Sequence, residues 1–135
     1  MLVSEVPGIL RIEWNSEGNT MVDTWTKYSI TVEQFRQAVL IQGIAFAKAH
    51  GVKSWVMDAA QAKGAFSPDV QKMIETENFP IFAKAGIKYF MTIKSASAIT
   101  NMSIDKYAAK LGPNGIQMVD VPDLKGAIAW LKAHP

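Results

Sequence analysis

The sequence predicts an α/β fold in which an N-terminal antiparallel hairpin leads into alternating helices and strands. Residues 10–15 alternate apolar and polar side chains, which is the period of a half-buried strand. Residues 55–57, WVM, form an unbroken apolar run of the kind found in strands covered on both faces. Stretches with apolar residues at helical spacing follow both patterns. Together they predict one mixed sheet of about five strands with about four helices.

The composition fits a single domain over residues 1–135. The chain has 135 residues, of which 49% are hydrophobic and 19% charged, so it can bury a core of its own. Its net charge is +2, and its scattered lysines do not form the basic face of a nucleic-acid-binding protein. Cysteine is absent, which removes disulfides, thiolate metal ligands and thiol nucleophiles. We expect a cytoplasmic protein, because the sequence shows neither a signal peptide nor an apolar stretch long enough to span a bilayer.

The first two predicted strands form the hairpin. Leu10, Ile12 and Trp14 alternate with polar neighbours. Residues 16–19, SEGN, have turn chemistry, and residues 20–26 are rich in threonine, valine and tryptophan, as a return strand is.

Thr31 opens the first predicted helix, and Gln34 completes a capping-box pattern with it. Gly51 ends this helix as a C-terminal glycine does. The inward stripe consists of residues at helical spacing: Val32, Phe35, Val39, Gly43 and Phe46. Ile41 and Ile44 fall on the opposite, polar side, so either a second layer or another subunit must cover them. We therefore treat Ile41 and Ile44 as a candidate homodimer face.

The end of the central strand is the candidate site for a ligand or a protein partner, since ligands of open α/β sheets gather at such ends. Asp58 closes the strand, Ser67 is expected to cap the following helix, and Pro68 takes its first position. The candidate site comprises this strand end and the loop after it: Asp58, Lys63, Gly64, Phe66 and Ser67.

The helix from Pro68 is expected to break or kink at Phe79, because Pro80 disfavours α geometry in the residue before it. Residues 88–94 then predict a second buried strand.

Three more elements are predicted in the C-terminal part. Residues 102–111 form a helix that Gly112 and Pro113 stop, and residues 116–119 form a short strand. Asp120 is expected to cap the final helix, whose inward stripe is Leu124, Ile128 and Leu131.

The chain resembles the bacterial STAS/SEC14-like family, which has the fold of the anti-sigma-factor antagonists. The resemblance extends over nearly the whole chain and rests on the segments ITVEQF, WVMD, SPDVQ, NFPIFAKAGIKYFMTI and DVPDLKGAIAWL. It implies a non-enzymatic module that binds partner proteins. In the antagonists a phosphorylated serine opens the helix after the central strand, the position that Ser67 has here. The surrounding AFSPDV lacks the short acidic motif of those phosphorylation sites, so we expect Ser67 to be a cap that carries no phosphate.

No pattern predicts catalysis. His50 and His134 lie at the ends of predicted helices, where a cation is favourable without any ligand role. Asp58 is expected to accept hydrogen bonds from the loop amides after it. Motifs for a serine nucleophile, a zinc-binding helix or a dinucleotide are absent from the sequence. We predict no catalytic residue, no metal site and no cofactor.

Three functions remain open. The preferred one is a non-enzymatic regulatory or protein-binding module of STAS-like type. The second is a carrier or sensor of a small apolar, lipid-like ligand, because the methionines and aromatic residues could line a cavity. The third is an uncharacterised enzyme.

Overall fold

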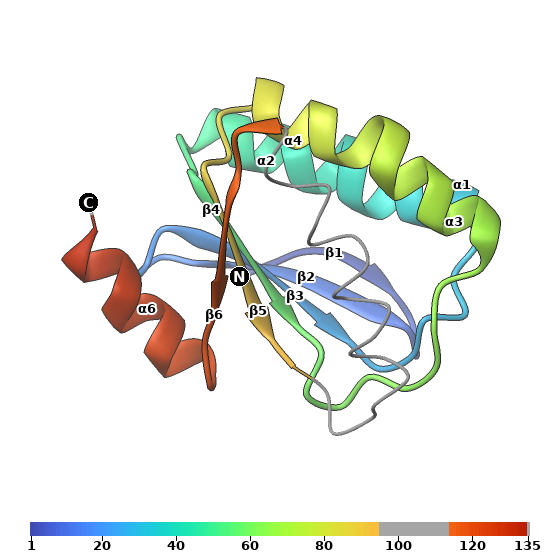
Figure 1. Cartoon of the computed structure of the whole chain (residues 1–135), viewed down its shortest axis with the longest axis horizontal. Helices are drawn as coiled ribbons and strands as arrows, with labels where there is room; N and C mark the ends of the chain where they lie inside the picture. The colour runs from blue at the N-terminus through green and yellow to red at the C-terminus, as the bar shows by residue number, and fades with distance from the viewer. Residues whose placement is uncertain (95–113, 135) are drawn as a thin grey trace.

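Six strands form one mixed sheet whose order along the sheet is their order along the chain (Figure 1). The computed structural model describes residues 1–94 and 114–134. The strands are β1 (Leu2–Val6), β2 (Leu10–Asn15), β3 (Thr20–Trp25), β4 (Ser54–Asp58), β5 (Tyr89–Ile93) and β6 (Gln117–Asp120). The first three are antiparallel, and β3 to β6 run parallel. The predicted α/β class and N-terminal hairpin are confirmed.

The strand β1 was not predicted, so the expected five strands are one too few. A register shift between Leu2 and Ser4 interrupts its pairing with β2. Ser4 is buried while Leu2 is 46% exposed, which reverses the usual placement of polar and apolar side chains. The alternation on which strand prediction depends is therefore missing here.

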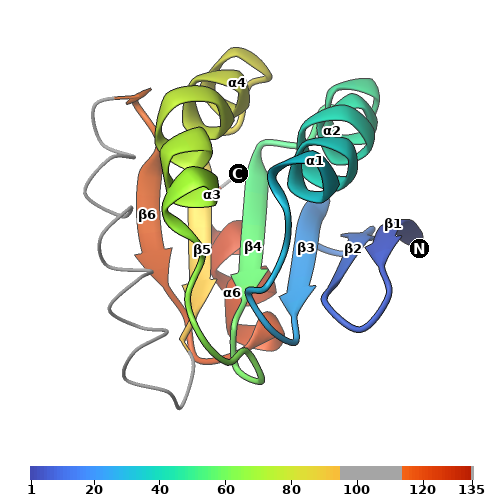
Figure 2. The ribbon, with the colours of Figure 1, turned by 90° about the vertical axis from the view of Figure 1, so that its right-hand side faces the viewer.

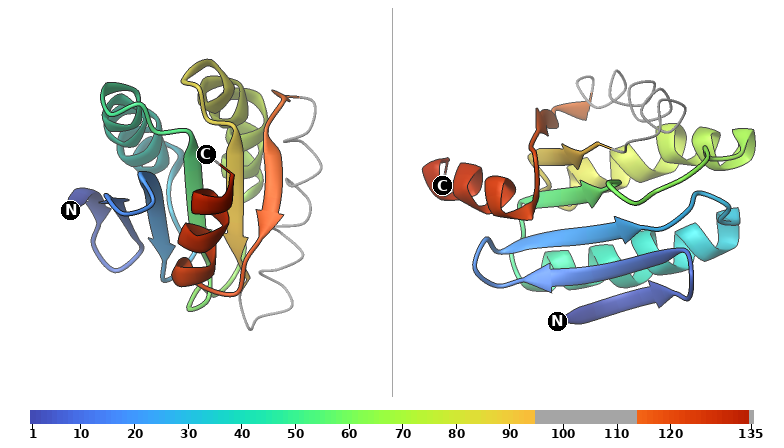
Figure 3. Two further views of the ribbon diagram at one scale, coloured as in Figure 1. Left: turned by 90° about the vertical axis from the view of Figure 1, so that its left-hand side faces the viewer. Right: turned by 90° about the horizontal axis from the view of Figure 1, so that it is seen from below.

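In the described part of the chain, two long helices cover one face of the sheet and a shorter helix covers the other (Figures 2 and 3). The first runs through α1 (Val32–Phe35), η1 (Arg36–Gly43) and α2 (Ile44–Ala49). The second runs through α3 (Pro68–Met73), η2 (Ile74–Asn78) and α4 (Phe79–Lys84). The helix α6 (Leu124–Ala133) lies on the opposite face. The predicted helix at 102–111 lies outside the described residues, and none of the described helices is both long and apolar enough to cross a membrane.

The helix ends follow the expected chemistry with one correction. Thr31 and Gln34 form the predicted capping box, with both hydrogen bonds at 3.0 Å. Gly51 follows the first helix with a φ of +61°, a conformation that glycine adopts without strain. The last helix is capped by Asp123 and not by Asp120, because Asp123 accepts a hydrogen bond from the Gly126 amide at 2.7 Å while Asp120 ends β6.

Ile44 is buried, with 5% of its surface exposed, so its predicted place on the outer face is wrong. Phe35 and Ile44 would lie on opposite sides of an α-helix of 3.6 residues per turn. The segment η1 between them is π-helical and fits more residues into each turn, which rotates Ile44 onto the face of Phe35. Ile41 remains 50% exposed.

The second helix does not break at Phe79, whose φ of −66° and ψ of −43° are helical. A proline ring in an α-helix clashes with the carbonyl four residues earlier. The π-helical segment η2 directly before Phe79 widens that turn and so accommodates Pro80. Of the predicted break or kink, the break is absent, and a local change of helix type is found in its place.

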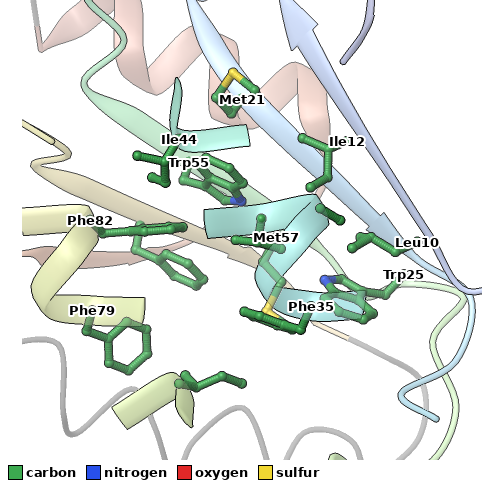
Figure 4. Close-up of a cluster of buried hydrophobic side chains, with 14 of the residues drawn as sticks. Leu10, Ile12, Met21, Trp25, Phe35, Ile44, Trp55, Met57, Phe79 and Phe82 are labelled. Atoms are coloured by element: carbon green, nitrogen blue, oxygen red, sulfur yellow. The ribbon is translucent and has the colours of Figure 1, made fainter. Parts of the chain in front are cut away.

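The core has one layer on each side of the sheet. The central strand β4 is buried on both faces, as predicted: Trp55, Val56 and Met57 are exposed by 0%, 0% and 3%. Trp55 and Met57 point toward the two long helices (Figure 4), whereas Val56 packs in the layer under α6. A Cβ atom at Gly43 would lie 2.8 Å from the ring of Trp55, so this glycine lets the first helix approach the sheet closely.

Candidate functional site

The five residues predicted at the end of β4 have different surroundings. The Asp58 carboxylate accepts a hydrogen bond from the Ala60 amide at 3.1 Å, which confirms its expected structural role. Lys63 and Gly64 are exposed, and the Lys63 carbonyl accepts a hydrogen bond from the Tyr28 amide. Phe66 is a core residue whose ring stacks on Tyr28 at a centroid distance of 4.2 Å.

Ser67 occupies the N-cap position of α3, but its hydroxyl does not cap the helix. The hydroxyl donates a hydrogen bond to the carboxylate of Asp69, and the same carboxylate oxygen accepts one from the Val70 amide at 3.0 Å. The hydrogen bond from Ser67 lowers the pKa of Asp69. The prediction that Ser67 accepts a bond from a first-turn amide is therefore wrong, because Asp69 takes that role.

A buried cavity of about 20 Å³ lies between the sheet and the two long helices. Eleven residues from four parts of the fold line it: Asp23, Trp25, Met57 and Phe90 from the sheet, Phe35 and Val39 from the first helix, Ile74, Asn78, Phe79 and Phe82 from the second, and Phe66 from the loop before it. Phe66 is thus the one member of the predicted site that reaches the cavity. The lining is mainly aromatic, and its volume is enough for about one water molecule.

Asp23 is the charged group of this cavity, and it is not among the residues predicted from the sequence. Its position in β3, between Ile12 and Met57 of the neighbouring strands, places it in the sheet interior, where 6% of its surface is exposed. One carboxylate oxygen, Oδ2, accepts a hydrogen bond from the Trp55 indole N–H at 2.9 Å. The available signal was its spacing: Asp23 lies two residues from both Met21 and Trp25, so it shares their inward face.

Burial raises the pKa of Asp23 from 3.8 to about 7. The indole N–H groups of Trp55 and Trp25 act in the opposite direction, while the nearby negative charge of Asp58 adds to the rise. Close to neutral pH the side chain is therefore divided between its protonated and ionised forms. A carboxyl with such a pKa inside a cavity is a common mark of a functional site.

Three polar atoms of the cavity lining lack a hydrogen-bond partner among residues 1–94 and 114–134. They are Asp23 Oδ1, Trp25 Nε1 and Asn78 Oδ1. The Trp25 N–H is close enough to influence the Asp23 carboxyl but does not bond to it. All three residues are more than nine-tenths buried. Unpaired buried polar atoms are unfavourable, so this combination requires an explanation.

An ion pair joins the two helices above the cavity. Arg36 follows Phe35 in the first helix, and Glu77 precedes Asn78 in the second. The Arg36 Nη2 atom donates to both carboxylate oxygens of Glu77, at 3.3 and 3.2 Å. Both side chains are partly exposed, so the pair contributes little to stability but connects the two π-helical segments.

A second, open groove of about 360 Å³ lies at the amino ends of β4 and β5. Its lining includes two lysines, Lys53 and Lys88, and the imidazole of His134. The C-terminal ends of the first helix and of α6 are also here, represented in the lining by Gly51 and His134. Because helix C-termini carry partial negative charge, the two lysines are explained by the helix ends beside them.

The two histidines cap helix C-termini, as predicted. His50 Nδ1 donates to the Phe46 carbonyl at 3.0 Å, and His134 Nδ1 donates to the Trp130 carbonyl at 2.8 Å. Each imidazole also stacks on the aromatic ring of the residue whose carbonyl it contacts, at 3.9 Å. Among the described residues no cluster of three or more acidic, histidine or cysteine side chains could hold a metal ion.

Comparison with known proteins found no match: no family model, no curated protein and no solved structure matches the chain.

Proposed function

We propose that this chain is a non-enzymatic binding module whose ligand is a small, largely apolar molecule held in the cavity around Asp23. The observation that carries the proposal is the combination of an aromatic lining with a buried carboxyl and two further unpaired polar atoms. Ligand pockets have this composition, with a mainly apolar wall and a few polar groups that fix the orientation of the ligand.

The geometry favours ligand binding over catalysis. Asp23 is the one titratable side chain among the described residues that line the cavity. General acid–base chemistry usually requires a second group within reach of the reacting atoms. Asn78 and Trp25 can position a ligand but do not exchange protons near neutral pH. The enzyme hypothesis therefore has less support than the binding hypothesis.

The predicted homodimer has lost one of its two surface residues. It depended on a paired apolar face formed by Ile41 and Ile44, and Ile44 is buried. The alternative of a STAS-like protein-binding module rests on the resemblance in fold and not on this face. A single exposed isoleucine such as Ile41 is ordinary and needs no partner. The STAS/SEC14-like relationship itself, the homodimer and the cytoplasmic location remain proposals. The hairpin followed by βα units supports the first of them.

Ligand entry requires the two long helices to separate, because pockets for small molecules are usually about 300–1,000 Å³ and this cavity is about 20 Å³. Two features of the helices favour such a movement. Both helices contain a π-helical segment next to the cavity, which is frequent at functional sites. Among the described residues, the charged link between these segments is the partly exposed pair of Arg36 and Glu77.

Native mass spectrometry of the freshly purified protein, together with thermal unfolding in the presence of toluene or benzyl alcohol, tests the proposal. We expect either a co-purified small molecule or a raised unfolding temperature with at least one of the two probes, because a ligand that binds the folded state stabilises it. Val39→Ile should fill the cavity and abolish the effect. Val22→Ile, the same change in the layer under α6, should preserve it. A wild type that carries no adduct and responds to neither probe contradicts the proposal.

A further inference from the structure

We infer that the ligand of the Asp23 cavity carries an uncharged polar group that both donates and accepts hydrogen bonds, as a primary amide or a hydroxyl does. This inference rests on the proposed function and specifies the class of ligand. It follows from the identity of the three unpaired atoms, which come from two elements on opposite sides of the cavity: β3 supplies Asp23 and Trp25, and η2 supplies Asn78.

The three atoms require both kinds of hydrogen-bonding partner. The Trp25 Nε1 atom can only donate, so the ligand must present an acceptor to it. Asn78 Oδ1 can only accept, and Asp23 Oδ1 accepts whenever the carboxyl is ionised, so the ligand must also present donors. A primary amide has two N–H donors and a carbonyl acceptor, which matches the set completely. A hydroxyl has one donor and two acceptor positions, which matches most of it.

Charged groups fit the same three atoms less well. An ammonium group only donates, so it leaves the Trp25 N–H unpaired. A carboxylate only accepts, and it would face the oxygens of Asp23 and Asn78. Either ion would also lose its hydration in a site walled by phenylalanines, which costs several kcal/mol when the pairing is incomplete. The aromatic walls attract cations, so an ammonium is the strongest competitor.

The polar group and the apolar body of the ligand occupy different parts of the cavity. The Trp55 indole already satisfies Asp23 Oδ2 from the side of β4, which leaves Oδ1 for the ligand. The rings of Phe35, Phe66, Phe79 and Phe82 provide the apolar walls around the polar atoms. An aromatic ring with one small polar substituent combines both requirements.

A series of ligands that share one ring and differ in the substituent tests the inference. Benzamide, benzyl alcohol, toluene, benzylamine and benzoate are titrated into the wild-type protein at pH 7.5, with binding measured by NMR chemical shifts. We expect benzamide to bind about tenfold or more tightly than toluene, because its amide makes hydrogen bonds to buried partners that toluene cannot make, and tenfold corresponds to about 1.4 kcal/mol. Benzylamine and benzoate should bind more weakly than benzamide.

The outcomes separate this inference from the proposed function. If toluene binds as tightly as benzamide, or benzylamine binds most tightly, the inference is wrong while the cavity remains a binding site. If none of the five compounds binds, the proposed function fails as well. If the wild type binds benzamide more tightly than toluene, Asn78→Leu should weaken the binding of benzamide until the difference is small. The binding of toluene should not change. The control Thr92→Val removes another unpaired buried hydroxyl that does not line the cavity, and it should preserve the preference.

Discussion

The indole nitrogen of Trp55 lies 2.9 Å from Oδ2 of Asp23, so the central strand donates a hydrogen bond to the buried carboxyl of the strand beside it. This contact links the most deeply buried part of the sheet to the cavity. It also opposes the effect of burial, since it lowers the pKa of Asp23. The stability of the fold and the charge of the candidate site therefore depend on the same pair of residues.

Trp55→Phe should destabilise the protein more at pH 8 than at pH 5. At pH 8 the Asp23 carboxylate is ionised and loses a charge-assisted hydrogen bond, whereas at pH 5 the carboxyl is neutral. We expect the two losses in free energy of unfolding, measured with urea, to differ by about 1 kcal/mol. Trp14→Phe removes an indole N–H that donates to Asn19 at 3.0 Å, away from the cavity, and should cost the same at both pH values. Equal losses for Trp55→Phe would argue against a role for this hydrogen bond in the charge of Asp23.

The stability of the wild type should fall as the pH rises from about 4 to about 7. The folded state binds the Asp23 proton more tightly than the unfolded chain does, because its pKa is about 7 instead of 3.8. The stability associated with protonated Asp23 is therefore present at low pH and is lost as the pH rises toward 7; this difference corresponds to as much as about 4 kcal/mol.

Asp23→Asn should remove most of this pH dependence. The amide oxygen can still accept the hydrogen bond from Trp55, but the side chain does not ionise. The variant should therefore be more stable than the wild type at pH 8. Asp120→Asn, at an exposed position, is the matched control and should keep the slope of the wild type. If the stability of both the wild type and Asp120→Asn stays level or rises between pH 4 and 7, the raised pKa of Asp23 is contradicted.

The sequence predicted the architecture well because its signals are local. The alternation in β2, the apolar run of β4 and the capping box at Thr31 each depend on neighbouring residues, and all three are present. Of the break or kink expected at Phe79, the break is absent, and the outward position of Ile44 was wrong, for one shared reason. Both predictions assumed an α-helical turn, and the two π-helical segments change the geometry at these positions.

The candidate site was harder to predict because it is made by long-range contacts. Asp23 and Asn78 are far apart in the sequence, and packing of the second helix on the sheet brings both into the lining of one cavity. An aspartate in a short strand also resembles a surface residue, since aspartate is seldom fully buried. The loop after β4 was predicted as a site from general rules for α/β sheets. These rules describe where ligands often bind but not which side chains come together.

Ile44→Glu should unfold or strongly destabilise the protein, whereas Ile41→Glu should leave it folded. Ile44 is buried, so its replacement places an unpaired carboxylate in the core, and we expect a loss of about 3 kcal/mol or more. Ile41 is half-exposed, and its replacement should change the free energy of unfolding by about 0.5 kcal/mol at most. Circular dichroism during urea unfolding measures both values. Sedimentation of wild type and Ile41→Glu tests the predicted homodimer, which would require the wild type to be the larger species.

Arg36→Gln should weaken the contact between the two long helices with little effect on overall stability. The ion pair with Glu77 is partly exposed, so its removal should change the free energy of unfolding by less than about 1 kcal/mol. Amide hydrogen exchange in η2 should nevertheless become faster, because this segment loses its charged contact with the first helix. Arg11→Gln, which removes the exposed pairs of Arg11 with Glu5 and Glu13, is the control and should leave η2 unchanged. If the amides of η2 are equally protected from hydrogen exchange in both variants, the ion pair does not stabilise the contact between the two helices.

Ser67→Ala should destabilise the protein clearly less than Thr31→Ala. The Thr31 hydroxyl accepts a hydrogen bond from the Gln34 amide, so its removal should cost about 1 kcal/mol, as the loss of a capping side chain generally does. The Ser67 hydroxyl instead donates to the Asp69 carboxylate, which already bonds to the Val70 amide and remains in place when Ser67 is replaced. Urea unfolding of the two variants side by side gives the comparison, and equal losses would mean that Ser67 acts as a true cap.

The same geometry argues that Ser67 carries no phosphate. A phosphate on its oxygen would replace the hydrogen that the hydroxyl donates to Asp69 and would place nearly two negative charges next to that carboxylate. The resulting repulsion opposes the favourable effect of the helix N-terminus on a negative group. Phosphopeptide mapping of protein purified from its native host should therefore find Ser67 unmodified. A stoichiometric phosphate at this position would overturn the expectation and would favour a regulatory switch of the anti-sigma-antagonist type over a ligand-binding module.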